Sequence, residues 1–60
     1  MSETATKLIK EAVLRALQKS PADITFYRER ENDHLLPPAY RQTLREAITE
    51  WVELQKTLRQ

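Results

Sequence analysis

The sequence predicts an all-α fold built on two long amphipathic helices, and three observations support this class. Apolar residues recur with helical spacing in two long stretches, one near each end of the 60-residue chain. Glycine is absent, so the tight turns that join neighbouring β-strands would be hard to form. Pro21, Pro37 and Pro38 lie where one helix would end and others would begin.

The first helix is predicted over about residues 3–19. Its apolar positions follow the i, i+3, i+4, i+7 spacing of one helical face, and they are Ala5, Leu8, Ile9, Ala12, Val13, Ala16 and Leu17. Ser20-Pro21 ends the helix, because the residue before a proline avoids helical backbone angles. Leu14 falls on the opposite, polar side, where it is either a single exposed leucine or the margin of a contact surface.

The last helix is predicted over about residues 38–59, with Pro37-Pro38 as its start signal. Its apolar face consists of Tyr40, Leu44, Ala47, Ile48, Trp51, Val52, Leu54 and Leu58. Trp51 is the largest residue near the middle of this face, so we expect it to be the packing centre.

The connecting segment over about residues 21–31 has two interpretations. Ser20-Pro21 begins a short helix if Ser20 is the N-cap and Pro21 the first helical residue. The apolar run Ile24–Tyr27 fits an extended strand almost as well, although a strand would need a partner from another chain. We favour the short helix, and we expect Ile24, either Phe26 or Tyr27, and the Leu35-Leu36 pair to form a lid over the open end of the two-helix hairpin.

The predicted architecture is a single domain over residues 1–60, in which the two long helices form an antiparallel hairpin. A core of this size barely offsets the conformational entropy lost on folding, and small proteins commonly add disulfides, metals or further subunits. The chain has no cysteine, which excludes disulfides. We therefore expect a second subunit or a partner to complete a helical bundle.

Charge is balanced overall but unevenly distributed along the last helix. The chain has 10 Lys and Arg against 9 Asp and Glu. On a helical projection, one edge of the last helix is basic (Arg41, Arg45, Lys56 and Arg59) and the other is acidic (Glu46, Glu50 and Glu53). In the predicted hairpin, the acidic edge faces Arg15 and Lys19. The basic edge needs an acidic cover, from Glu29, Glu31 or Asp33, from a second copy, or from an external partner.

Several classes of function find no support in the sequence. The cluster of His34 with Glu31 and Asp33 lies in a polar turn of a chain too small to enclose an active site. We therefore expect no enzyme, no cofactor, no metal site and no small-molecule substrate. The chain contains no apolar run long enough to cross a membrane and no signal-peptide pattern, so we expect a soluble, cytoplasmic protein.

Two functional hypotheses remain. The first is a protein–protein interaction module (a regulator, inhibitor or adaptor) that docks its apolar helical face on another protein or on a second copy. The second, which we rank lower, is a nucleic-acid-binding dimer that uses the basic edge. The candidate partner-binding residues are Arg41, Arg45, Trp51, Lys56, Arg59, Tyr27 and Leu14.

Overall fold

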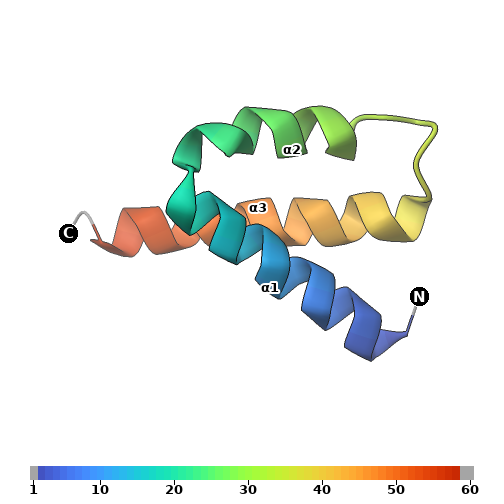
Figure 1. Cartoon of the computed structure of the whole chain (residues 1–60), viewed down its shortest axis with the longest axis horizontal. Helices are drawn as coiled ribbons and strands as arrows, with labels where there is room; N and C mark the ends of the chain where they lie inside the picture. The colour runs from blue at the N-terminus through green and yellow to red at the C-terminus, as the bar shows by residue number, and fades with distance from the viewer. Residues whose placement is uncertain (1, 59–60) are drawn as a thin grey trace.

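The computed structural model describes residues 2–58, and the regular structure in this range consists of helices without strands. Helix α1 spans Glu3–Lys19, a 3₁₀ turn spans Pro21–Asp23, α2 spans Ile24–Glu31 and α3 spans Pro38–Leu58 (Figure 1). The predicted all-α class is confirmed, as is the choice of a helix rather than a strand for the connecting segment.

The ends of α1 are closed by local hydrogen bonds. The Ser2 hydroxyl accepts a hydrogen bond from the backbone N–H of Ala5, as expected of an N-cap serine. At the other end, the backbone N–H of Ser20 donates to the carbonyl of Ala16 over 2.9 Å. Ser20 therefore caps the C-terminal end of α1 through its backbone N–H. Its side chain makes no capping bond to the 3₁₀ turn, contrary to the N-cap role predicted for it.

The turn from α2 into α3 is built by Asn32 and Asp33. The Asn32 side-chain amide donates to the Arg28 carbonyl over 2.9 Å, and the Asp33 carboxylate accepts from the backbone N–H of Leu35 over 2.9 Å. Local bonds of this kind are the reason that Asn and Asp favour turns. Leu35 is 93% exposed, so its predicted role in the lid was wrong: the turn directs it away from the helices.

The predicted antiparallel pairing of the two long helices is not what the structure shows. In Figure 1, α1 and α3 run in the same general direction and cross, and α2 lies alongside α3 at the top of the view and runs in the opposite direction. The contacts agree, because Lys10 pairs with Glu50 while Gln18, further along α1, lies near Leu54 and Leu58. The physical reason is the length of the connection. The 3₁₀ turn and α2 together return the chain along α3 instead of merely closing the end of a hairpin.

The core lies where α1 and α2 both pack on α3. Its buried apolar residues within residues 2–58 are Val13, Leu17, Leu44, Ala47, Ile48 and Trp51. Tyr27 and Ile24 of α2 pack against this cluster, as the lid prediction required of them. Thr43 is also buried, and its hydroxyl donates to the Ala39 carbonyl over 2.9 Å, which satisfies the polar group inside the protein.

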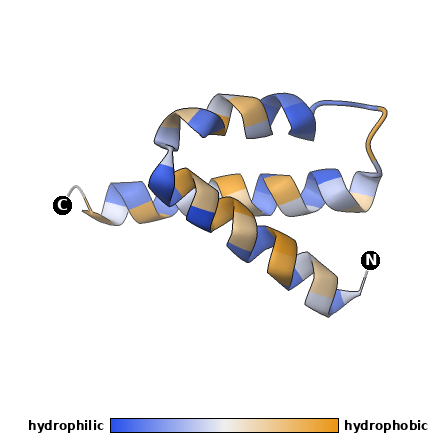
Figure 2. Ribbon diagram, viewed as in Figure 1, coloured by the Kyte–Doolittle hydropathy of each residue, from blue (hydrophilic) through white to orange (hydrophobic). Residues whose placement is uncertain are grey.

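Only one side of the apolar face of α1 is covered. Val13 and Leu17 are buried against α3, whereas Leu8 is 61% exposed and Ala12 is exposed. Figure 2 shows apolar residues on the side of α1 turned to the viewer. Leu14, predicted on the polar side, is half-buried and packs against the core. The apolar face of α1 is too broad for its contact with α3 to cover completely. The side of the face next to Leu14 is buried, and the side with Leu8 and Ala12 stays exposed.

Candidate protein-binding surface

An open apolar groove lies at the end of α3. Its volume is about 540 Å³. Helix α3 contributes Trp51, Leu54, Gln55, Thr57 and Leu58, and the end of α1 with the following turn contributes Gln18 and Pro21. We call this surface the C-terminal groove. None of its lining residues is charged, and such a recess can hold apolar side chains from another chain.

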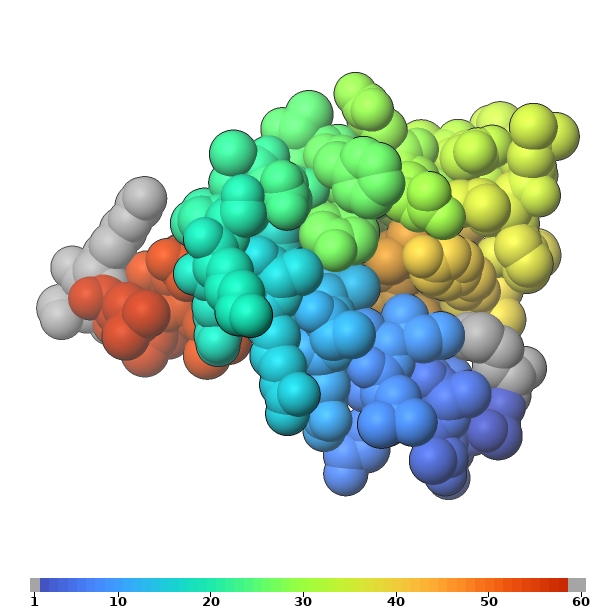
Figure 3. Space-filling view, in the orientation of Figure 1, coloured from blue at the N-terminus to red at the C-terminus, as the bar shows by residue number. Residues whose placement is uncertain are grey.

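The C-terminal groove exists because α3 is longer than the helices that cover it. Figure 3 shows the red end of α3 projecting past the turn between α1 and α2. The apolar face of α3 continues along this projection, where Leu54 is 43% exposed and Leu58 is 77% exposed. Apolar residues therefore recur with helical spacing along α3 as far as Leu58, beyond the part of this face that α1 and α2 cover.

The apolar residues among the predicted partner-binding candidates lie in or near the core. Trp51 is only 8% exposed, so it is a core residue, as expected for the packing centre, and it also lines the C-terminal groove. Tyr27 and Leu14 are half-buried against the core. Of these three candidates, Trp51 is the one that the structure brings together with the groove.

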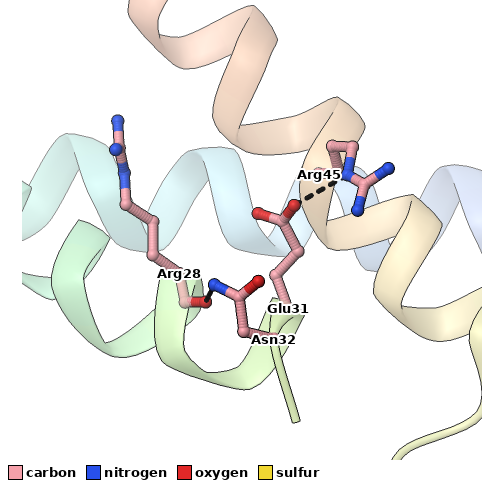
Figure 4. A network of polar contacts seen from close by, with 4 residues as sticks. All are labelled: Arg28, Glu31, Asn32 and Arg45. Atoms are coloured by element: carbon pink, nitrogen blue, oxygen red, sulfur yellow. Dashed lines mark hydrogen bonds and ion pairs between the residues drawn. The ribbon is translucent and has the colours of Figure 1, made fainter. Parts of the chain in front are cut away.

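The basic edge of α3 contacts α2 through one ion pair. The Arg45 Nε donates a hydrogen bond to Glu31 Oε1 over 2.7 Å (Figure 4). Glu31 is one of the three acidic residues predicted to cover this edge. The Arg45 side chain is 61% exposed and that of Glu31 only 16%, so solvent meets the guanidinium rather than the carboxylate.

The other members of the basic edge are not brought together. Arg41 lies one helical turn before Arg45 and is half-buried, and its Nε is buried without a hydrogen-bond partner in the part of the chain that the structure describes. Lys56 lies 3.8 Å from Glu53 on the exposed end of α3. Arg59 lies outside the described residues. Among the described members, Arg41 and Arg45 therefore lie together, and Lys56 lies apart from them.

The acidic edge of α3 pairs with α1, although not with the expected residues. Lys10 Nζ lies 2.9 Å from Glu50 Oε2, whereas Arg15 and Lys19 had been predicted as partners. The direction of α1 contributes to the difference, since Gln18, next to Lys19, lies near Leu54 and Leu58 at the end of α3. The hydrogen bond to Glu50 raises the pKa of Lys10, partial burial opposes this, and the charges of Glu50 and Glu46 add to the increase.

One aromatic cluster was not foreseen from the sequence. The Arg30 guanidinium lies 5.5 Å from the centre of the Phe26 ring and 5.7 Å from that of Tyr40. Phe26 in turn meets Tyr27 edge to face, with 5.4 Å between ring centres. Cation–π contacts of this kind join α2 to the first turn of α3. The sequence signal was the i, i+4 spacing of Phe26 and Arg30.

Across residues 2–58, no group of His, Asp and Glu side chains is arranged to hold a metal ion. Over the same range, each helix is too short or too polar to cross a membrane. His34 is exposed in the turn before α3.

Neither a protein-family model, nor a curated protein, nor a solved structure matches this chain significantly.

Proposed function

We propose that this chain is a protein–protein interaction module, a small helical regulator or adaptor without catalytic activity, that dimerises through the C-terminal groove. The observation that carries the proposal is the uncovered apolar end of α3, where Leu54 and Leu58 stand beside an apolar groove of about 540 Å³. A second copy of the chain is the occupant to which we commit.

The shape of this surface supports a two-fold arrangement. A symmetric dimer interface must be complementary to itself, because the same patch serves both subunits. Here an exposed side chain, Leu58, lies at the rim of a recess formed by Trp51, Pro21 and Gln18. Two copies can therefore each place Leu58 in the groove of the other, and this reciprocal insertion buries the apolar end of both α3 helices.

The exposed area also supports a dimer. The chain exposes 4631 Å². A compact monomer of 7.1 kDa would expose about 4,100 Å². The excess of about 500 Å² is of the same order as, but below, the roughly 600–1,000 Å² that each subunit buries in an interface of ordinary size. Burial of this surface would add apolar contacts to a core of only six buried apolar side chains among the described residues.

Sedimentation equilibrium on two matched variants tests the proposal. Leu58→Glu places a charge at the rim of the groove, whereas Leu35→Glu makes the same change at a leucine that is 93% exposed in the turn before α3. We expect the unmodified chain and Leu35→Glu to be dimers at micromolar concentration and Leu58→Glu to be a monomer. A monomeric unmodified chain, or equal weakening by both substitutions, would refute the dimer.

A further inference from the structure

We infer that a second surface, formed by Arg28 of α2 and by Arg41 and Arg45 of α3, binds an acidic segment of another protein. We call this surface the arginine face. It is separate from the C-terminal groove, so the inference does not depend on the proposed dimer.

The arginine face carries more positive charge than the chain compensates. Figure 4 shows Glu31 between the side chains of Arg28 and Arg45. Within residues 2–58, Glu31 forms an ion pair with Arg45, and Arg28 and Arg41 are in no ion pair. The Glu31 side chain is 16% exposed, whereas that of Arg45 is 61% exposed, Arg28 is exposed and Arg41 is half-buried.

The geometry of Arg45 leaves its outer hydrogen-bond donors available. Its bond to Glu31 uses Nε, and Figure 4 shows the two terminal nitrogen atoms pointing away from that carboxylate. These terminal groups form the planar fork that binds a carboxylate through two parallel hydrogen bonds. Glu31 thus orients Arg45 without occupying its outer side.

Arg41 adds a second positive charge next to this fork. It is one helical turn from Arg45 and half-buried, and its buried Nε has no acceptor among residues 2–58. Because this Nε is buried, a ligand does not reach it, and Arg41 acts on a ligand through its charge. An anionic group bound to Arg45 would therefore also be attracted by Arg41.

The complementary charge must come from outside the chain. The acidic edge of α3 is compensated within its own chain, because Glu50 pairs with Lys10 and Glu53 lies near Lys56. A second copy would bring its own 10 Lys and Arg together with its 9 Asp and Glu, whereas an acidic segment brings negative charge alone. The formal net charge of +1 means that the chain carries one more basic side chain than acidic side chains.

An acidic protein segment fits this face better than a nucleic acid does. A phosphate backbone running along α3 would meet Glu46, Glu50 and Glu53 on the other edge of the same helix. Stacking of bases is also hindered, because Arg30 already lies over the rings of Phe26 and Tyr40. A short acidic segment needs only the arginine face itself.

Fluorescence anisotropy with two labelled probes tests the inference. One probe is a short polyglutamate peptide and the other an oligothymidylate of the same length, each measured at about 50 and about 200 mM NaCl. The double variant Arg28→Gln/Arg41→Gln removes two charges from the face without breaking an ion pair. The matched control, Lys7→Gln/Lys19→Gln, removes two exposed charges from α1.

We expect the peptide to bind the unmodified chain, and the arginine double variant to weaken this binding by about tenfold, equivalent to about 1.4 kcal/mol. The control should weaken it by less than about threefold, as a general effect of net charge. The single variant Arg28→Gln, at an exposed position, provides the same test if the double variant loses helical structure. Equal loss in the control, or tighter binding of the oligothymidylate than of the peptide, would overturn the inference.

Discussion

Lys10 of α1 and Glu50 of α3 form an ion pair with 2.9 Å between Nζ and Oε2, and this pair joins the two long helices near the middle of α1. Gln18, further along α1, lies near Leu54 and Leu58 of α3. The two helices therefore run in the same general direction, and Gln18 and Pro21 form one wall of the C-terminal groove near the last turns of α3.

The Lys10–Glu50 pair should stabilise the fold at neutral pH and lose its effect in strong base. A raised lysine pKa means that the folded state holds the proton more tightly than the unfolded chain does. The contribution is therefore complete below the unfolded pKa of about 10.4 and disappears as the pH rises through the higher folded value. Because both side chains are partly exposed, it should not exceed about 1 kcal/mol.

Urea denaturation of Lys10→Gln as a function of pH checks this prediction. The difference in the free energy of unfolding from the unmodified chain should be constant between about pH 7 and 9, and it should decrease as the pH rises above the unfolded pKa of about 10.4 and through the higher folded value. Lys7→Gln, at an exposed position nearby, serves as the control and should show no such change. A difference for Lys10→Gln that persists in strong base would assign its effect to packing of the side chain rather than to its charge.

Trp51→Ala should be the most damaging truncation in α3. Trp51 is 8% exposed and packs in the core cluster, so its removal leaves a cavity that the helices cannot fill. Substitutions of this kind cost about 3–5 kcal/mol, a large fraction of the stability of a small domain. Chemical denaturation should show a greater loss than for Leu54→Ala, which removes a partly exposed side chain. The reverse order would show that Trp51 contributes less to folding than its burial indicates.

The Glu31–Arg45 pair should orient α2 more than it stabilises the fold. Its coupling energy from a double-mutant cycle with Glu31→Gln and Arg45→Gln should be at most about 1 kcal/mol, because Arg45 is largely exposed. Amide hydrogen exchange of α2 should nevertheless increase in both single variants, since the pair joins the last turn of α2 to α3. Unchanged exchange in α2 would mean that Tyr27 and Ile24 alone hold this helix.

Sequence periodicity was sufficient to predict the helices but not their relative directions. The stretches with 3.6-residue spacing became α1 and α3 with nearly the predicted bounds. The short helix α2 was harder to assign, because Ile24–Tyr27 fits two periods equally well. The sequence pattern of residues 24–31 did not reveal that α2 runs back along α3. Because α2 reverses the chain in this way, α1 and α3 run in the same general direction.

Burial within α1 shows why the candidate site was only partly predictable. A helical projection identifies Leu8 and Leu17 as members of one apolar face, but it does not reveal which side of the face a neighbouring helix will cover. Leu17 became fully buried and Leu8 stayed exposed. The C-terminal groove likewise depends on how far α3 extends beyond α1 and α2, which is a property of the assembled fold.

The distance between two α3 ends tests the central claim most directly. Because the chain has no cysteine, Lys56→Cys places a single spin label on each copy, near the groove but outside its lining. Lys7→Cys places a matched label at the far end of α1. Dimerisation through the C-terminal groove predicts a short intermolecular distance between labels at position 56 and a much longer one between labels at position 7. Labels at position 7 that lie closer together than those at position 56, or the absence of any intermolecular signal at position 56, would contradict it.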